Sequence, residues 1–166
     1  MKKGIVWLAL YIATIFVANW AVSTFDIVPV GFGLMAPAGV YVVGLAFTFR
    51  DLVQESLGTR AVIGAILVGA ALSAVISPAL ALASGTAFLF SELADLSVYT
   101  PLRERHWIGA VAASNLVGLV LDSAIFLYLA FGSLEFLPGQ VVGKLLMTAL
   151  AVVVLSPFRR GQVANA

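Results

Sequence analysis

Residues 5–25 read IVWLALYIATIFVANWAVSTF, and this run decides the class of the protein. A transmembrane helix needs about 20 mostly apolar residues, and the run meets that length with Asn19 inside it. Lys2 and Lys3 precede the run, as in a signal peptide, but the apolar part of a signal peptide spans only about 7–15 residues. The run therefore predicts a retained transmembrane span.

The composition of the whole chain indicates the same class. The protein has 166 residues, of which 62% are hydrophobic and 10% charged, and its mean hydropathy is +1.10. A soluble domain is about half apolar and about a quarter charged, so too few polar side chains are present to cover a surface that faces water. We expect an integral membrane protein with one domain over residues 1–166 and the lipid bilayer as its surroundings.

Several classes of chemistry are excluded by residues that the chain lacks. There is no cysteine, which rules out disulfides, thiolate catalysis and cysteine metal sites. His106 is the sole histidine, so a histidine metal cluster is impossible. Residues 139–144 read GQVVGK and lack the spacing and the hydroxyl residue of a phosphate-binding loop. We expect no metal and no cofactor, and the net charge of +1 argues against nucleic acid as a partner.

The apolar runs predict an all-α fold of six transmembrane helices, because period-two alternation is absent. Turn residues mark the breaks, including Ser84–Gly85–Thr86 between the third and fourth spans. The expected spans are residues 5–25, 34–54, 61–83, 86–102, 107–131 and 138–158.

The basic residues decide the orientation. Asp26 and Glu135 lie in the outer loops, which carry no lysine or arginine. Seven basic residues gather on the other side: Lys2, Lys3, Arg60, Arg103, Arg105, Arg159 and Arg160. This positive-inside pattern predicts that both termini are cytoplasmic. The expected location is the cell inner (cytoplasmic) membrane, as a multi-pass protein.

The fourth span carries two acids inside an apolar run, FLFSELADLSVY at residues 88–99. Phe88, Glu92, Asp95 and Tyr99 fall within about 60° of arc on a helix. An acid near mid-bilayer costs about 2.5–3.5 kcal/mol, so the two carboxylates need a partner. A flat heterocycle that stacks on the rings and donates N–H groups is one candidate. A basic residue on a neighbouring helix is the other.

Further polar residues interrupt the first, fifth and sixth spans. Asn115 and Asp122 lie two turns apart on nearly one face of the fifth span, and Gln140 and Lys144 lie one turn apart on the sixth. Lys144 has two interpretations. In the first its side chain extends to the membrane interface, and in the second it neutralises Glu92, Asp95 or Asp122. Asn115 and its small neighbours also fit a role in helix packing.

Two more patterns concern the second and third spans. Arg50, Asp51, Gln54 and Glu55 predict either a secondary polar network at membrane depth or a solvated inner helix end. The third span has an unbroken stripe of small residues that predicts a packing surface, inside the bundle or against another protein. The stripe consists of Ala61, Ala65, Gly69, Ser73 and Ser77.

The order and spacing of several short motifs resemble those of the queuosine precursor transporter family, also called the VUT family of vitamin-uptake-like transporters. The similarity covers roughly residues 34–150. The chain departs from the family in its clipped loops and in an apolar start of the fifth span. The motifs are Asp51…Glu55…Gly58, SELAD at residues 91–95, SNLVGLVLDSAIF at residues 114–126, and Ala130–Phe131–Gly132 followed by residues 139–144.

The resemblance implies a six-helix inner-membrane carrier that imports 7-deazaguanine queuosine precursors. Such small planar bases would bind between the first, fourth, fifth and sixth spans. Glu92 and Asp95 would accept the N–H groups of the base, and Phe88 and Tyr99 would stack on it. Asp122 would orient the donors or carry a proton. The donors would be Asn115, Gln140 and Lys144, with Asn19 nearby.

Two other functions stay open on the sequence alone. The protein could be a substrate-capture subunit that docks on an energising partner through the third-span stripe. It could also be a membrane enzyme or a structural assembly protein, although we expect a transporter and no enzyme. A homo-oligomer is compatible with either binding function.

Overall fold

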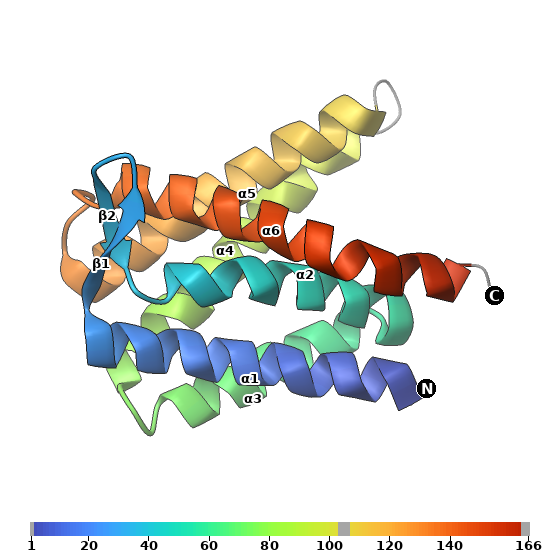
Figure 1. The fold of residues 1–166 in the computed structure, drawn as a ribbon, viewed down its shortest axis with the longest axis horizontal. Helices are drawn as coiled ribbons and strands as arrows, with labels where there is room; N and C mark the ends of the chain where they lie inside the picture. Colours follow the sequence, from blue (N-terminus) through green and yellow to red (C-terminus); the bar gives the residue numbers. More distant parts are fainter. Residues whose placement is uncertain (1, 103–106, 164–166) are drawn as a thin grey trace.

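The computed structural model describes residues 2–102 and 107–163 (Figure 1). Within them the chain forms six α-helices and one β-hairpin, so the predicted number of helices is confirmed and the hairpin is new. The elements are α1 (Lys2–Phe25), β1 (Ile27–Gly31), β2 (Leu34–Pro37), α2 (Val40–Leu57), α3 (Thr59–Ser73), α4 (Pro78–Leu102), α5 (Trp107–Phe131) and α6 (Leu137–Val163).

The helices run alternately up and down the bundle. Figure 1 shows α1 beginning and α6 ending at one end, which we call the terminal end, with the hairpin at the opposite end. Helix α2 packs against both α1 and α6, and α3 packs on α1. Helices α4 and α5 pack mainly on each other, and this pair leans away from the remaining helices in Figure 1.

The hairpin replaces the start of the predicted second span, which was wrong for residues 34–39. Strands β1 and β2 are antiparallel, and their turn places Phe32 and Gly33 at positive φ, as a tight two-residue hairpin turn requires. The first turn of α6 packs against β2 so closely that a Cβ on Gly139 would lie 1.9 Å from the backbone oxygen of Met35. Only glycine allows this contact, which fixes the start of α6 against the hairpin.

The break between the third and fourth spans was also predicted in the wrong place. Helix α3 ends at Ser73 and α4 begins at Pro78, so Ser84–Thr86 lies inside α4. Ser77 caps α4, because its Oγ accepts a hydrogen bond of 3.3 Å from the backbone N–H of Leu80. Proline is well suited to the first position of a helix, where no hydrogen bond is lost. The dipeptide Ser77–Pro78 was therefore the stronger boundary signal.

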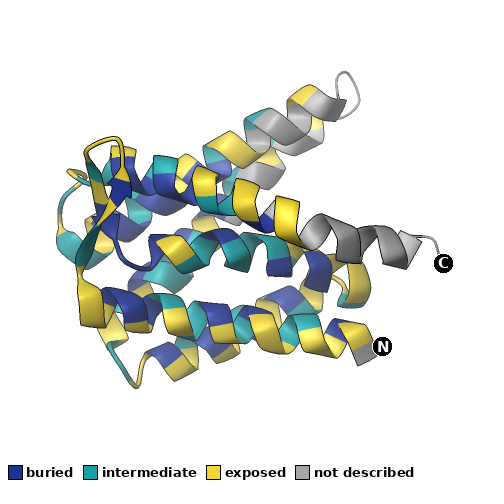
Figure 2. Cartoon of the chain, in the orientation of Figure 1, coloured by how far each residue is buried: buried dark blue, intermediate teal, exposed yellow. Residues whose placement is uncertain are grey.

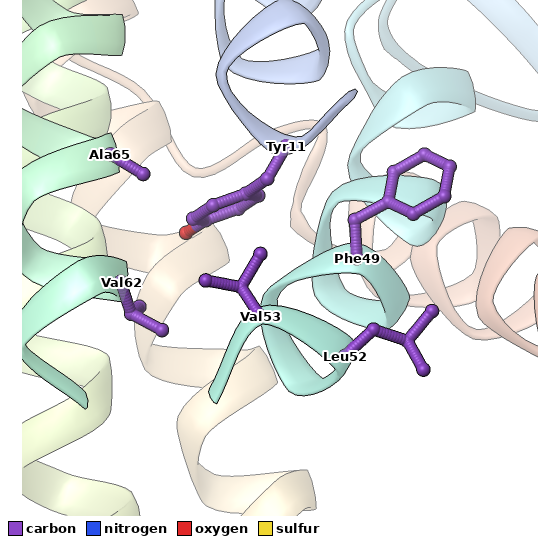
Figure 3. Close-up of a cluster of buried hydrophobic side chains, with 6 residues drawn as sticks. All are labelled: Tyr11, Phe49, Leu52, Val53, Val62 and Ala65. Carbon is purple, nitrogen blue, oxygen red and sulfur yellow. The ribbon is translucent and has the colours of Figure 1, made fainter. Parts of the chain in front are cut away.

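Buried residues line the inner faces of the helices, while large apolar side chains cover the outside (Figure 2). One cluster joins α1, α2 and α3, with the Tyr11 ring between Val53 of α2 and Ala65 of α3 (Figure 3). A second cluster joins Val22 of α1 to α4 and to Phe126 of α5. A cavity lies between these two clusters, since Tyr11, Val22 and Phe126 all line it.

Among the described residues, one helix is both long and apolar enough for a membrane crossing. Its stretch Lys3–Phe25 has 23 residues and a mean hydropathy of 2.0. The other apolar helical stretches of the described residues have 10–17 residues each. They cover Thr59–Ser73, Pro78–Ser91, Asn115–Phe131 and Leu137–Ala151. That all six helices cross the membrane stays a prediction.

Candidate functional site

The cavity in the middle of the bundle has a volume of about 100 Å³ and receives side chains from all six helices. Room for one water takes about 10–15 Å³ by this kind of measure, so the cavity is large enough for a small molecule. Apolar and aromatic groups make most of the wall, including Phe47, Phe88 and Phe126. The polar and charged side chains in the wall are Tyr11, Thr14, Asn19, Ser84, Asp122, Gln140 and Lys144.

Helix α1 supplies one polar wall. Tyr11, Thr14 and Asn19 of α1 all line the cavity. Thr14 Oγ1 donates a hydrogen bond of 2.7 Å to the backbone oxygen of Tyr11. Asn19 Nδ2 donates to Ser84 Oγ at 3.1 Å and to the backbone oxygen of Ile15 at 3.3 Å. The bond between Asn19 and Ser84 ties α1 to α4 across the cavity.

Helices α5 and α6 place an ion pair in the wall. Lys144 Nζ lies 2.5 Å from Asp122 Oδ2 and donates a second hydrogen bond of 2.9 Å to Ser123 Oγ. Lys144 is only 2% exposed and Asp122 9%. A charge so far from water is stable only when it is paired and hydrogen-bonded. The structure therefore supports neutralisation of Asp122 by Lys144, and it places the lysine side chain inside the bundle instead of at the membrane interface.

Gln140 lies one turn before Lys144 on the same face of α6 and is 3% exposed. Its carbonyl oxygen Oε1 is buried and has no hydrogen-bond partner among the described residues. The cavity wall therefore contains a buried acceptor, Gln140 Oε1, that lacks a hydrogen bond.

The structure brings together five of the residues that the sequence singled out for binding. Asn19, Phe88, Asp122, Gln140 and Lys144 all line the cavity. Asn115 is exposed and lies outside the lining, because seven residues along α5 separate it from Asp122 by about 10 Å. The side chains of Glu92, Asp95 and Tyr99 lie outside the described residues, although their backbone belongs to α4.

The polar residues of α2 form a separate group near the terminal end. Arg50 donates from Nη2 and Nε to Asp51 Oδ1, at 2.8 and 3.0 Å. Asp51, Gln54 and Glu55 are exposed and line a shallow hollow. The Arg50 guanidinium also lies 5.8 Å from the ring centroid of Phe47, which lines the cavity. A solvated helix end and a polar network at membrane depth both stay predictions for this group.

The small-residue stripe of α3 packs inside the bundle. Ala65, Gly69 and Ser73 are buried. A Cβ on Gly69 would lie 2.8 Å from a side-chain carbon of Ile15 in α1, so the glycine permits close approach of the two helices. Of the two interpretations of this stripe, these contacts favour packing inside the bundle, and docking on an energising partner stays untested.

Reasoning from the sequence missed Tyr11, Thr14, Phe47, Ser84 and Phe126 as cavity residues. A usable signal existed on α1, where Tyr11, Thr14 and Asn19 are polar residues inside an apolar helix. Ser84 was assigned to a turn. No pattern marks Phe47 or Phe126, because a phenylalanine in an apolar helix looks the same whether it faces a cavity or lipid.

A family model described as "Putative vitamin uptake transporter" matches residues 74–159, which is more than half of the chain. The matched part holds the ion pair, Gln140 and Phe88, whereas the wall formed by α1 lies outside it. No curated protein and no solved structure matches the chain.

Proposed function

We propose, from the premise that this chain belongs to the family of vitamin uptake transporters, that it imports a 7-deazaguanine queuosine precursor across the cell inner membrane. Membership of this family supports a transporter rather than an enzyme. The observation that carries the proposal is the central cavity, whose wall holds aromatic rings, the amides of Asn19 and Gln140 and one buried ion pair.

The chemistry of the wall suits a small flat base. A 7-deazaguanine presents adjacent N–H donors and a carbonyl acceptor on its edge, while both faces of its ring are apolar. Phe88 and Phe126 offer apolar faces against which such a ring can pack. Gln140 and the hydroxyl of Tyr11 offer donors and acceptors for its edge. We propose that Glu92 and Asp95, further along α4, extend the site and accept N–H groups from the base.

The arrangement of the helices supports a position near mid-membrane. Tyr11, Thr14 and Asn19 lie in the interior of α1, the one helix that is both long and apolar enough over the described residues to cross a membrane. The helix starts that carry Lys3 and Arg60 lie at the terminal end, and Asp26 lies beside the hairpin at the other end (Figure 1). We propose that all six helices cross the membrane and that the terminal end faces the cytoplasm.

Uptake by purified protein tests the proposal. Proteoliposomes that contain the protein should accumulate a radiolabelled 7-deazaguanine faster than protein-free vesicles, and unlabelled adenine should compete poorly. In detergent, the same base should raise the melting temperature by mass action, whereas thiamine and riboflavin should not. A melting shift with a vitamin and none with any deazaguanine would overturn the assigned substrate.

A further inference from the structure

The amide of Gln140 differs from the other polar groups of the cavity. Four buried side-chain atoms of the described residues lack a hydrogen-bond partner, and Gln140 Oε1 is the one of them that belongs to the cavity wall. Leaving a buried carbonyl unpaired costs free energy, so such a group usually has a partner. A ligand bound in the cavity could supply that partner.

Several other polar side chains of the cavity wall already donate hydrogen bonds within the protein. Lys144 donates to Asp122 and Ser123, and Asn19 donates to Ser84. Thr14 donates to its own helix backbone. These contacts are made within the protein, whereas Gln140 Oε1 is a buried acceptor of the described wall with no partner, so it can accept a hydrogen bond from a bound molecule.

A carboxamide has its acceptor and its donor side by side in one plane. It can therefore form two parallel hydrogen bonds with a group that presents the opposite pair, as glutamine does with adenine in DNA. A cyclic lactam, in which a ring N–H adjoins a carbonyl, is such a group. Rotation of the amide by half a turn exchanges its two ends, so the pairing does not depend on which end was placed inward.

We propose that Gln140 determines specificity by pairing its amide with the lactam edge of a planar heterocycle held in this cavity. The inference rests on the proposed function for the place of binding, and it adds which edge of the base is read and by which residue. Phe88 and Phe126 line the same cavity, so a ring paired with Gln140 would have apolar groups to pack against.

The test compares two probes that differ at the lactam: 7-cyano-7-deazaguanine and its N1-methyl derivative. Wild-type protein in detergent should bind the methylated probe at least about tenfold more weakly, because the methyl group removes the donor that faces Gln140. In Gln140→Met and in Gln140→Leu, the affinities for the two probes should differ by no more than about twofold. The matched control is Gln54→Met, an exposed glutamine on α2, which should keep the wild-type ratio.

The ligand-free melting temperature provides a second readout. If Gln140 serves a ligand, replacing its unpaired amide by an apolar side chain should leave that temperature unchanged or raise it. A lower melting temperature together with an unchanged ratio of affinities would assign Gln140 a structural role and overturn the inference.

The outcomes separate the inference from the proposed function. If the variants discriminate between the probes as wild type does, the inference fails and the assigned substrate stands. A second outcome is that wild type binds no deazaguanine but binds uracil or a pterin more tightly than the N-methyl derivative of that compound. If the Gln140 variants lose this preference, the assigned substrate is wrong and the role of Gln140 stands. Binding of no lactam by wild type overturns both.

Discussion

Asp122 and Asp51 each pair with a basic residue, yet they occupy opposite environments. The side chain of Asp51 is 59% exposed and bonds its neighbour Arg50 on the same helix. The side chain of Asp122 is 12% exposed and bonds Lys144 on another helix, inside a cavity. The first pair can exchange its partner for water, whereas the second cannot. The same chemical contact is therefore worth little at the helix end and is essential in the middle of the bundle.

The largest expected effect comes from one substitution made at both aspartates. Asp122→Asn leaves the Lys144 charge buried without its counter-ion and should lower the free energy of unfolding by about 3–5 kcal/mol. Asp51→Asn removes a contact that is exposed to solvent and should cost about 0–1 kcal/mol. Denaturant titration of both variants in mixed micelles measures the difference. Equal stabilities would show that Lys144 does not depend on Asp122.

Removing both charges of the buried pair sharpens the comparison. A buried ion pair can often be replaced by apolar residues without loss of stability. We therefore expect Asp122→Leu combined with Lys144→Met to recover most of the roughly 3–5 kcal/mol that the single change costs. If the ion pair serves transport, the double variant should nevertheless show no uptake. A double variant as unstable as the single one would locate the damage in packing instead of charge.

Two glycines of α3 extend the comparison from charge to shape. Gly69 faces Ile15 of α1, whereas a Cβ on Gly64 would meet nothing within 4 Å. Gly69→Leu should cost about 1–3 kcal/mol through overpacking, and Gly64→Leu should change stability by less than about 0.5 kcal/mol, as outward-facing substitutions usually do. Thermal melting in detergent compares them. If Gly64→Leu were the more damaging change, α3 would have to turn its other face toward α1.

The sequence predicted the number of helices and five residues of the cavity wall, because both depend on local patterns. Apolar length identifies a helix, and an isolated polar residue such as Gln140 in such a helix usually faces the interior. What the sequence left open depended on packing. Lys144 had three acids to choose from, and only the relative position of α5 and α6 selects Asp122. The hairpin was missed because residues 34–39 are as apolar as the helix that follows them.

The smallest effect concerns two serines of α4, which share a helix but face different surroundings. Ser84 accepts a hydrogen bond from Asn19 across the cavity, whereas Ser97 is exposed and its hydroxyl donates to the backbone oxygen of Ala94 in its own helix. Ser84→Ala removes one of the two acceptors of Asn19 Nδ2 and leaves the backbone oxygen of Ile15 as the other. The free energy of unfolding should therefore fall by about 0.5–1.5 kcal/mol. Ser97→Ala should be neutral within about 0.5 kcal/mol, because alanine also favours the helix. Since both changes are small, they need denaturant titrations in parallel on one preparation. A cost at Ser97 that matched the cost at Ser84 would mean that the bond between α1 and α4 adds nothing, and that the two helices are held by their apolar contacts alone.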